Sequence, residues 1–286
     1  MTKKIRKIRK LLQGRVYDLY GELRDREEIQ EFFKCRCPCV VKGSLENWPA
    51  RVLWRPPFFR LLELVRPGKQ IKVAVSGASF SGVNTNYIDM SFFEFLSRPE
   101  DAPYTCYMAQ CPILSSEGLS EQEALSPLLL DLKKPRFLPS EEFCVYFWMN
   151  TKEVVSEFHY DSYQNLLTVV HGSKIVELIP PSRLINSYTI DNEAYNHTPS
   201  DLSGEFKVTL FAGDVLYIPE GWWHKVKSSP YTVGLSFTWN GVDQQVLAKD
   251  TNGELDFFVV RNAMKRIALK EIEKSIERDA CKVQIE

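Results

Sequence analysis

Three residues of this chain have the types and the spacing that bind a transition metal. His159 and Asp161 are separated by one residue, and a further histidine, His224, lies later in the chain. Side chains two positions apart on a β-strand point to the same face, so His159 and Asp161 can reach one ion together. Two imidazoles and one carboxylate form the facial triad that holds Fe(II) on one side and leaves the other side open. The sequence therefore predicts a mononuclear iron site.

Lys174 follows this motif at a position where its ammonium group, if buried, would need an anionic partner. Lys174 comes directly after the dipeptide Gly172-Ser173, which separates the apolar runs 165–171 and 174–179. Apolar runs around a Gly-Ser pair are typical of a β-hairpin. Strand alternation gives Lys174 apolar neighbours on its own face, and a buried ammonium group needs an anion. A small molecule with a carboxylate would supply that anion.

The segment around His224 is patterned in the same way. Residues 211–214 predict a turn, and Val215 begins a short apolar strand that Pro219 ends. A second turn leads to His224, and residues 231–239 predict another strand. A histidine just after such a corner can point at a site on the axis of a β-barrel. The chemistry-bearing residues are therefore expected on short strands that surround one interior.

From about residue 104 to 240, the chain resembles the JmjC or cupin-like Fe(II)- and 2-oxoglutarate-dependent oxygenases, and most of all their small hydroxylase branch. The matching pieces are Tyr107 to Gln110, Trp148, Ser156, the His159-x-Asp161 motif, Asn165, Gly172 to Lys174, Ile179 to Pro181, Ala212 to Pro219, and Trp223-His224. The resemblance implies a double-stranded β-helix, also called a jelly roll.

The resemblance also assigns roles to the residues. The triad binds Fe(II), which takes O₂ and the co-substrate 2-oxoglutarate, and Lys174 holds the distal carboxylate of that co-substrate. Tyr107 and Ser156 assist the lysine, and Asn165 lies near the site. Strict alternation places Ser156 on the opposite face from His159, so a β-bulge or a sharp twist must lie between them if both face the site. Where some family members carry an asparagine on the last core strand, this chain has Ser236.

Three outcomes of the oxidation are compatible with this family. Hydroxylation of a protein side chain is the first expectation, demethylation of N-methyl-lysine the second, and hydroxylation of a modified tRNA base the third. A non-catalytic cupin-type binding module is the alternative from another functional class. In that case the triad would consist of ordinary core polar residues and Lys174 would be a solvated turn residue. A cupin enzyme that needs no co-substrate would have no use for a buried lysine.

Composition places limits on partners and location. The chain has 286 residues, 44% of them hydrophobic, which is enough for one sizeable core. Its net charge of −1 gives no general field for nucleic acid, although the basic residues 1–10 could contact RNA. We expect no membrane span and no secretory signal, hence a cytoplasmic or nuclear protein. An odd count of seven cysteines indicates reduced thiols, and Cys35, Cys37 and Cys39 lack the paired spacing of a zinc knuckle.

The expected architecture is mainly β with flanking helices. Residues 1–141 predict an N-terminal helical and α/β region, helical and charged up to about residue 35, that packs on the core. Residues 142–240 predict the double-stranded β-helix, and 241–286 a C-terminal helical segment. Within it, residues 256–278 carry an apolar stripe that would either cap the barrel edge or form a homodimer interface.

Overall fold

The computed structural model describes most of the chain between residues 17 and 239. The described residues are 17–20, 26–65, 67–76, 80, 85–99, 101–114, 123–139, 142–161, 163–180 and 204–239. The expected C-terminal helix over 256–278, which would cap the barrel edge or form the homodimer interface, lies outside these residues. The basic stretch 1–10 also lies outside them. Among the helices that are described, none is long and apolar enough to cross a membrane.

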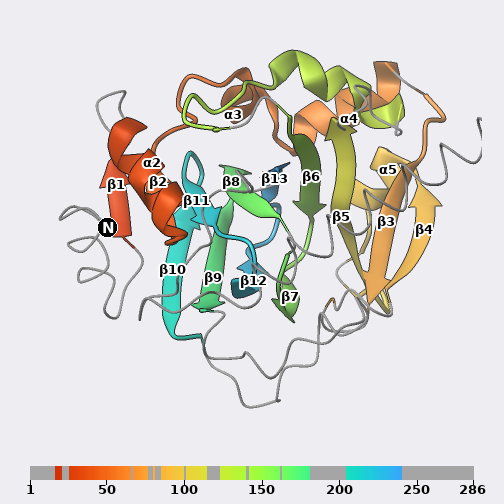
Figure 1. The fold of residues 1–286 in the computed structure, drawn as a ribbon. Helices are drawn as coiled ribbons and strands as arrows, with labels where there is room; N and C mark the ends of the chain where they lie inside the picture. Colours follow the sequence, from red (N-terminus) through yellow and green to blue (C-terminus); the bar gives the residue numbers. More distant parts are fainter. Residues whose placement is uncertain are drawn as a thin grey trace, which may run out of the picture.

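Two β-sheets form the body of the protein (Figure 1). The larger sheet has nine strands, in the order β1 (Tyr17–Tyr20), β2 (Cys39–Lys42), β11 (Val215–Ile218), β8 (Gln164–His171), β13 (Val233–Trp239), β6 (Cys144–Asn150), β5 (Thr105–Leu114), β3 (Ile71–Ser76) and β4 (Asn86–Met90). The smaller sheet has four, in the order β10 (Phe206–Phe211), β9 (Ser173–Ile179), β12 (Trp223–Ser228) and β7 (Val154–His159). This mainly β, cupin-like arrangement confirms the predicted fold class.

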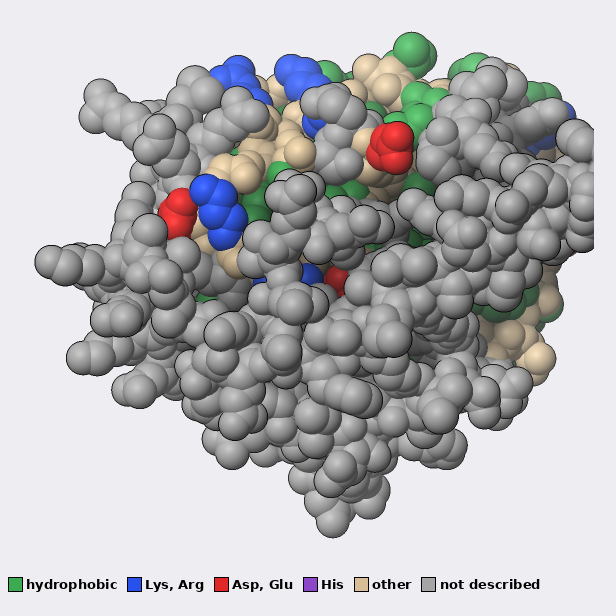
Figure 2. Space-filling model, viewed as in Figure 1, with side chains coloured by type: hydrophobic (Ala, Val, Ile, Leu, Met, Phe, Trp, Pro, Cys, Tyr) green, Lys and Arg blue, Asp and Glu red, His purple; other side chains and the backbone are tan. Residues whose placement is uncertain are grey.

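Short helices cover the outer face of the larger sheet. They are α2 (Arg26–Cys35), α3 (Pro49–Leu53), α4 (Pro56–Val65), α5 (Phe92–Leu96) and the 3₁₀ helix η2 (Glu123–Asp131). Trp54 and Phe59 each pack 5.8 Å from Phe147 of β6, measured between ring centroids. Hydrophobic and basic side chains lie along the upper edge of the space-filling view, the side on which Figure 1 places α3 and α4 (Figure 2). The apolar faces of the helices thus bury the back of the sheet.

The larger sheet separates an outer core from an inner one. Along β8, Leu166 and Val170 face the helices, whereas Leu167 and Val169 face the smaller sheet. A strand that is buried on both faces reads as a continuous apolar run, which explains the sequence of this segment. The inner core between the sheets is the place toward which the polar residues of the motifs can converge.

The predicted hairpin around Gly172 is wrong. β8 belongs to the larger sheet and β9 to the smaller one, so the two strands do not pair. Both edges of β8 are already occupied, by β11 and by β13, which leaves no edge for β9. The chain turns at Gly172, which has a φ of 80°, and crosses from one sheet to the other. The apolar runs were correctly recognised as strands, but their partners lie far away in the chain.

The start of the chain also departs from expectation. Residues 17–20, expected to be helical, form β1, which pairs in parallel with β2. The other edge of β2 is bound to β11, so an added strand is the way to satisfy the remaining backbone groups of β2. Helix α2 follows as predicted. Helix α5 begins with a serine cap, in which the Ser91 Oγ accepts from the Glu94 amide.

Substitution of Gly172 tests the crossing between the sheets. A Cβ at this position would lie 2.8 Å from the Thr232 Cα and would also strain a left-handed backbone. We expect Gly172→Ala to lower the free energy of unfolding by about 2–4 kcal/mol, measured by urea denaturation. Gly68→Ala is the matched control, because Gly68 has a φ of 74° and no atom within 4 Å of the added Cβ. It should cost only about 1 kcal/mol; equal losses would contradict the clash.

Candidate functional site

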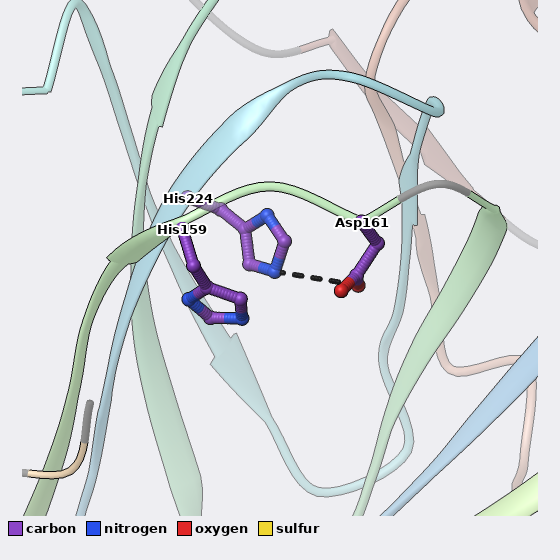
Figure 3. Close-up of side chains that lie close together, drawn as sticks. All are labelled: His159, Asp161 and His224. Carbon is purple, nitrogen blue, oxygen red and sulfur yellow. Dashed lines mark ion pairs between the residues drawn. The ribbon is translucent and has the colours of Figure 1, made fainter. Parts of the chain in front are cut away.

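The three predicted metal ligands meet at one end of the smaller sheet. His159 ends β7 and lies directly opposite His224 of β12 in the strand register. Asp161 follows β7, and the ligand atoms of the three side chains all lie within 4.8 Å of one another. The His224 Nε2 is 3.7 Å from the Asp161 Oδ2, and the two imidazole centroids are 4.2 Å apart (Figure 3). The structure therefore brings together residues that the sequence places in two separate segments.

Backbone carbonyl groups orient both imidazole rings. The Nδ1 of His159 lies 2.7 Å from the Glu157 carbonyl oxygen, and the Nδ1 of His224 lies 3.0 Å from that of Trp222. A carbonyl accepts only, so each Nδ1 carries the proton and each Nε2 keeps its lone pair for a metal. The carbonyl of Asp161 accepts from the Gly221 amide at 3.0 Å, which holds the third ligand against the β11–β12 turn.

The electrostatics of the site favour neutral imidazole. Burial lowers the pKa of His224 to about 4, and the nearby His159 adds to this effect while Asp161 opposes it. Metal ligands must be deprotonated, so His224 is in the metal-binding form at neutral pH. Two neutral imidazoles and one carboxylate suit Fe(II) in its facial triad. Within the described residues, this is the one cluster of three such ligands, and neither Cys37 nor Cys39 belongs to it.

A second polar group lies deeper in the inner core, around Lys174. This side chain is 2% exposed, and its Nζ donates to the Ser228 Oγ at 2.7 Å. No carboxylate among the described residues forms an ion pair with it, and burial lowers its pKa to about 7. A buried amine of this kind gains stability when an anion arrives. The inward orientation predicted for Lys174 is confirmed.

Tyr107 completes this polar group from the larger sheet. Its hydroxyl is within hydrogen-bonding reach of Ser156 and Ser228, and burial raises its pKa, so it stays protonated and able to donate. Trp148 packs 5.8 Å from the Tyr107 ring, between centroids. The structure thus places Lys174 and Tyr107 in one polar cluster that Ser228 joins, with apolar and aromatic side chains beside it.

Ser156 reaches this polar cluster because β7 is bulged. In the register with β12, His159 lies opposite His224 and Ser156 lies opposite Val226, so β7 contains one residue more than its partner between these pairs. The predicted bulge is confirmed. It shifts the alternation by one position and lets Ser156 and His159 face the same interior.

Asn165 has an unused acceptor in this interior. Its side chain is 5% exposed, and its Oδ1 is buried without a hydrogen-bond partner among the described residues. Buried polar atoms in native proteins are nearly always satisfied, so a bound small molecule or water is the natural donor. On the neighbouring strand, Ser236 accepts from the Trp148 Nε1 at 3.0 Å, so its hydroxyl is engaged with protein.

Ser228 is a site residue that the sequence reasoning did not find. It sits on β12 four positions after His224, with Val226 between them on the same face. Strand alternation could have placed Ser228 in the interior. Its contact with Lys174, however, depends on the register with β9, in which the two residues lie directly opposite each other. A short pairing of this kind cannot be read from local spacing.

Comparison with known proteins relates the chain to a described family. The model of the cupin-like domain matches residues 25–245, which is most of the chain. Over 155 residues the chain is 39% identical to the lysine-specific demethylase JMJ31 of Arabidopsis thaliana, covering 48% of this chain and 28% of that protein. The chain therefore spans less than a third of the length of this relative.

Two human proteins match over more of their length. The bifunctional peptidase and (3S)-lysyl hydroxylase JMJD7 is 27% identical over 250 residues, covering 70% of this chain and 76% of that protein. The tRNA wybutosine-synthesizing protein 5 is 27% identical over 255 residues, covering 80% of this chain and 79% of that protein. These similarities cover most of the chain rather than one short motif.

Removal of the anionic ligand tests the metal site. We expect Asp161→Ala to weaken binding of Fe(II) or Co(II) by more than about 100-fold, because two neutral imidazoles alone lack the charge that holds a divalent ion. Anaerobic calorimetry with the metal alone measures this without any assumption about turnover. Asp89→Ala, at an exposed position on β4, is the control that should bind like the wild type. Equal affinity in the two variants would remove Asp161 from the site.

The pH dependence of stability tests the burial of Lys174. In the unfolded chain this amine keeps its proton up to about 10.5, whereas in the folded protein it releases the proton above about 7. Between these values the unfolded state binds more protons, so the free energy of unfolding should rise with pH, by up to about 1.4 kcal/mol per unit. Urea denaturation of ligand-free protein from pH 7 to 9 should show this rise relative to Lys174→Met. Parallel pH profiles would mean that the amine is hydrated.

Proposed function

Because the chain belongs to the cupin-like domain family, alongside its JmjC oxygenases, we propose that it is an Fe(II)- and 2-oxoglutarate-dependent oxygenase that hydroxylates a protein side chain. The main support is the presence of the metal-binding triad and of the buried, anion-seeking Lys174 in one interior. Either feature alone occurs in many proteins, but an iron enzyme that uses a dicarboxylate needs both.

In this proposal the two polar groups hold the two halves of the active complex. His159, Asp161 and His224 hold Fe(II), which together with 2-oxoglutarate and O₂ supplies the oxidising equivalents for hydroxylation of a C–H bond, with succinate and CO₂ as by-products. Lys174 pairs with the distal carboxylate of 2-oxoglutarate, and the Tyr107 hydroxyl donates to the same group.

The protein residues around the lysine have a positioning role. Ser228 fixes the amine through the 2.7 Å hydrogen bond, and Ser156 lies within reach of the Tyr107 hydroxyl. Arrival of a carboxylate favours the charged form of Lys174, so we expect proton uptake when 2-oxoglutarate binds near neutral pH. Val176 and Leu178, both fully buried, and Trp148 keep water away from this end of the interior.

The substrate would approach from the side of Asp161. The Asp161 side chain is 36% exposed, whereas that of His224 is 4% exposed, so the triad is open on the aspartate side. Tyr146 of β6 lies near it; burial raises the pKa of this phenol, and Tyr163 and Asp161 raise it further. A half-buried tyrosine beside an exposed one offers an amphipathic rim that suits a protein side chain better than a free metabolite.

Demethylation of N-methyl-lysine is the second candidate, and the 39% identity to a lysine-specific demethylase favours it. The same oxidation on an N-methyl group releases formaldehyde, whereas hydroxylation leaves oxygen on the substrate. A tRNA substrate has the support of the human and chicken tRNA wybutosine-synthesizing protein 5, but the net charge of −1 provides no general basic field. A non-catalytic module would have no need for the complete triad together with Lys174.

Truncation of Lys174 tests the assignment of the co-substrate. We expect Lys174→Ala to raise the KM for 2-oxoglutarate by two or more orders of magnitude, because loss of one partner of a buried pair costs about 3–5 kcal/mol. Succinate formation with Fe(II) and ascorbate is the measurement, and N-oxalylglycine should compete with 2-oxoglutarate. Lys227→Ala, at a half-exposed residue of β12, is the control. A change in KM below about threefold would show that Lys174 does not hold the co-substrate.

The class of substrate can be tested by capture and product analysis. Mn(II)-substituted protein with N-oxalylglycine should retain its substrate, and mass spectrometry should identify what it retains beyond the Asp161→Ala control. Incubation of that molecule with the active enzyme then separates the candidates. Added oxygen on a protein side chain supports the proposal, formaldehyde release supports demethylation, and an RNA in place of a protein contradicts both.

A further inference from the structure

Phe80 makes an unusual contact with the bulged strand. It forms an isolated parallel bridge with Ser156 of β7. The Phe80 amide donates to the Val155 carbonyl at 2.8 Å, and the Glu157 amide donates to the Phe80 carbonyl at 3.0 Å. The two hydrogen bonds therefore bracket Ser156 on both sides.

This bridge occupies the outer edge of the smaller sheet, which carries no other strand among the described residues. β7 is the end strand of that sheet, with β12 on its inner edge. The bulge lies between Ser156 and His159, and an added residue in a strand disturbs the local ladder. The Glu157 amide belongs to the bulged segment, and Phe80 is the residue that accepts from it. A one-residue bridge thus stabilises the segment whose shape puts Ser156 and His159 on one face.

The Phe80 side chain contacts the second polar group of the site. Residues paired in a bridge point to the same face, so the Phe80 ring lies on the inward side, beside Ser156. Its centroid is 5.3 Å from that of Tyr107, with the rings at 63°, and the side chain is 7% exposed. Ala74 and Val154 complete this apolar contact. The ring therefore fixes the back of Tyr107, whose hydroxyl lies near Ser156 and Ser228.

A short chain of contacts links the same residue to the metal ligands. The Glu157 carbonyl accepts from the His159 Nδ1 at 2.7 Å, while the amide of Glu157 is the group that donates to Phe80. Movement of Glu157 would turn the His159 ring, because the hydrogen bond at the His159 Nδ1 sets the direction in which its Nε2 points. Phe80 thus contacts the co-substrate end directly and the metal end through one residue.

We propose that Phe80 is a positioning residue that holds the β7 bulge and Tyr107 in register, so that metal and 2-oxoglutarate bind in the correct relative position. The part that concerns 2-oxoglutarate rests on the proposed function, whereas the part that concerns the metal rests on the triad alone. The proposed role differs from a packing role in that loss of Phe80 should weaken both ligands more than the loss of stability explains.

The test compares three variants of the full chain. Phe80→Ala removes the ring and loosens the bridge, and Phe80→Leu keeps an apolar side chain against Tyr107. Phe95→Ala removes a fully buried ring of α5 that packs in the outer core, on the helix side of the larger sheet. The readouts are the melting temperature, the affinity for Co(II) by calorimetry, and the KM and kcat for 2-oxoglutarate from succinate formation.

We expect Phe80→Ala to raise the KM for 2-oxoglutarate by about tenfold or more and to weaken Co(II) binding several-fold. At saturating metal and 2-oxoglutarate, its kcat should stay within about threefold of the wild type, since the reacting groups are intact. Phe80→Leu should restore most of both affinities. Phe95→Ala should leave both unchanged even if its melting temperature falls further.

Two results would overturn the role of Phe80. One is unchanged KM and Co(II) affinity in Phe80→Ala, and the other is equal losses in Phe95→Ala, which would indicate general destabilisation. Failure of the proposed function looks different: wild-type protein would bind Co(II) but neither 2-oxoglutarate nor N-oxalylglycine. In that case the affinity for Co(II) alone still tests whether Phe80 positions the metal ligands. Weaker Co(II) binding by Phe80→Ala than by the wild type supports this role, and equal binding contradicts it.

Discussion

The pairing of β12 with its two neighbours is the interaction on which the site depends. Through β7 it sets His224 opposite His159, and through β9 it sets Ser228 opposite Lys174. Both the metal-binding triad and the polar cluster around Lys174 are therefore positioned by β12, at residues four positions apart. Backbone hydrogen bonds between the strands fix the distance between the two groups. A slip of one residue would turn every one of these side chains to the other face. The larger sheet then closes the interior and adds Tyr107 and Asn165.

Local pattern was sufficient for part of the site. The His-x-Asp spacing predicted two of the metal ligands, although Asp161 lies just beyond the end of β7. Alternation put Lys174, Val176 and Leu178 on one face of their strand, and the expectation of a bulge before His159 also needed the family resemblance, which placed Ser156 in the site. The hairpin at Gly172 was wrong because a Gly-Ser pair between apolar runs marks a change of direction without saying which strand comes next to which. β1 was misjudged because its partner, β2, offers an edge that only the assembled sheet reveals.

Ser228 and Phe80 were not found for the same reason. Their importance comes from what lies opposite them, on strands that are distant in sequence, and neither stands in a recognisable motif. Ser228 needs the register with β9, and Phe80 needs a bridge of one residue to β7. Residue types that carry chemistry are thus visible in a sequence, whereas the groups that hold them in place become visible with the strand register.

The crossing at Gly172 has a consequence for how the protein folds. Successive strands switch between the sheets, so β8 awaits β11 and β13, and β9 awaits β10 and β12. Nearly all the pairings that build the interior join residues far apart in sequence, and such contacts form slowly because long loops must close first. The metal ligands come together when β12 pairs with β7, which precedes it by more than 60 residues in the chain. A bound metal ion therefore reports the formation of this long-range pairing.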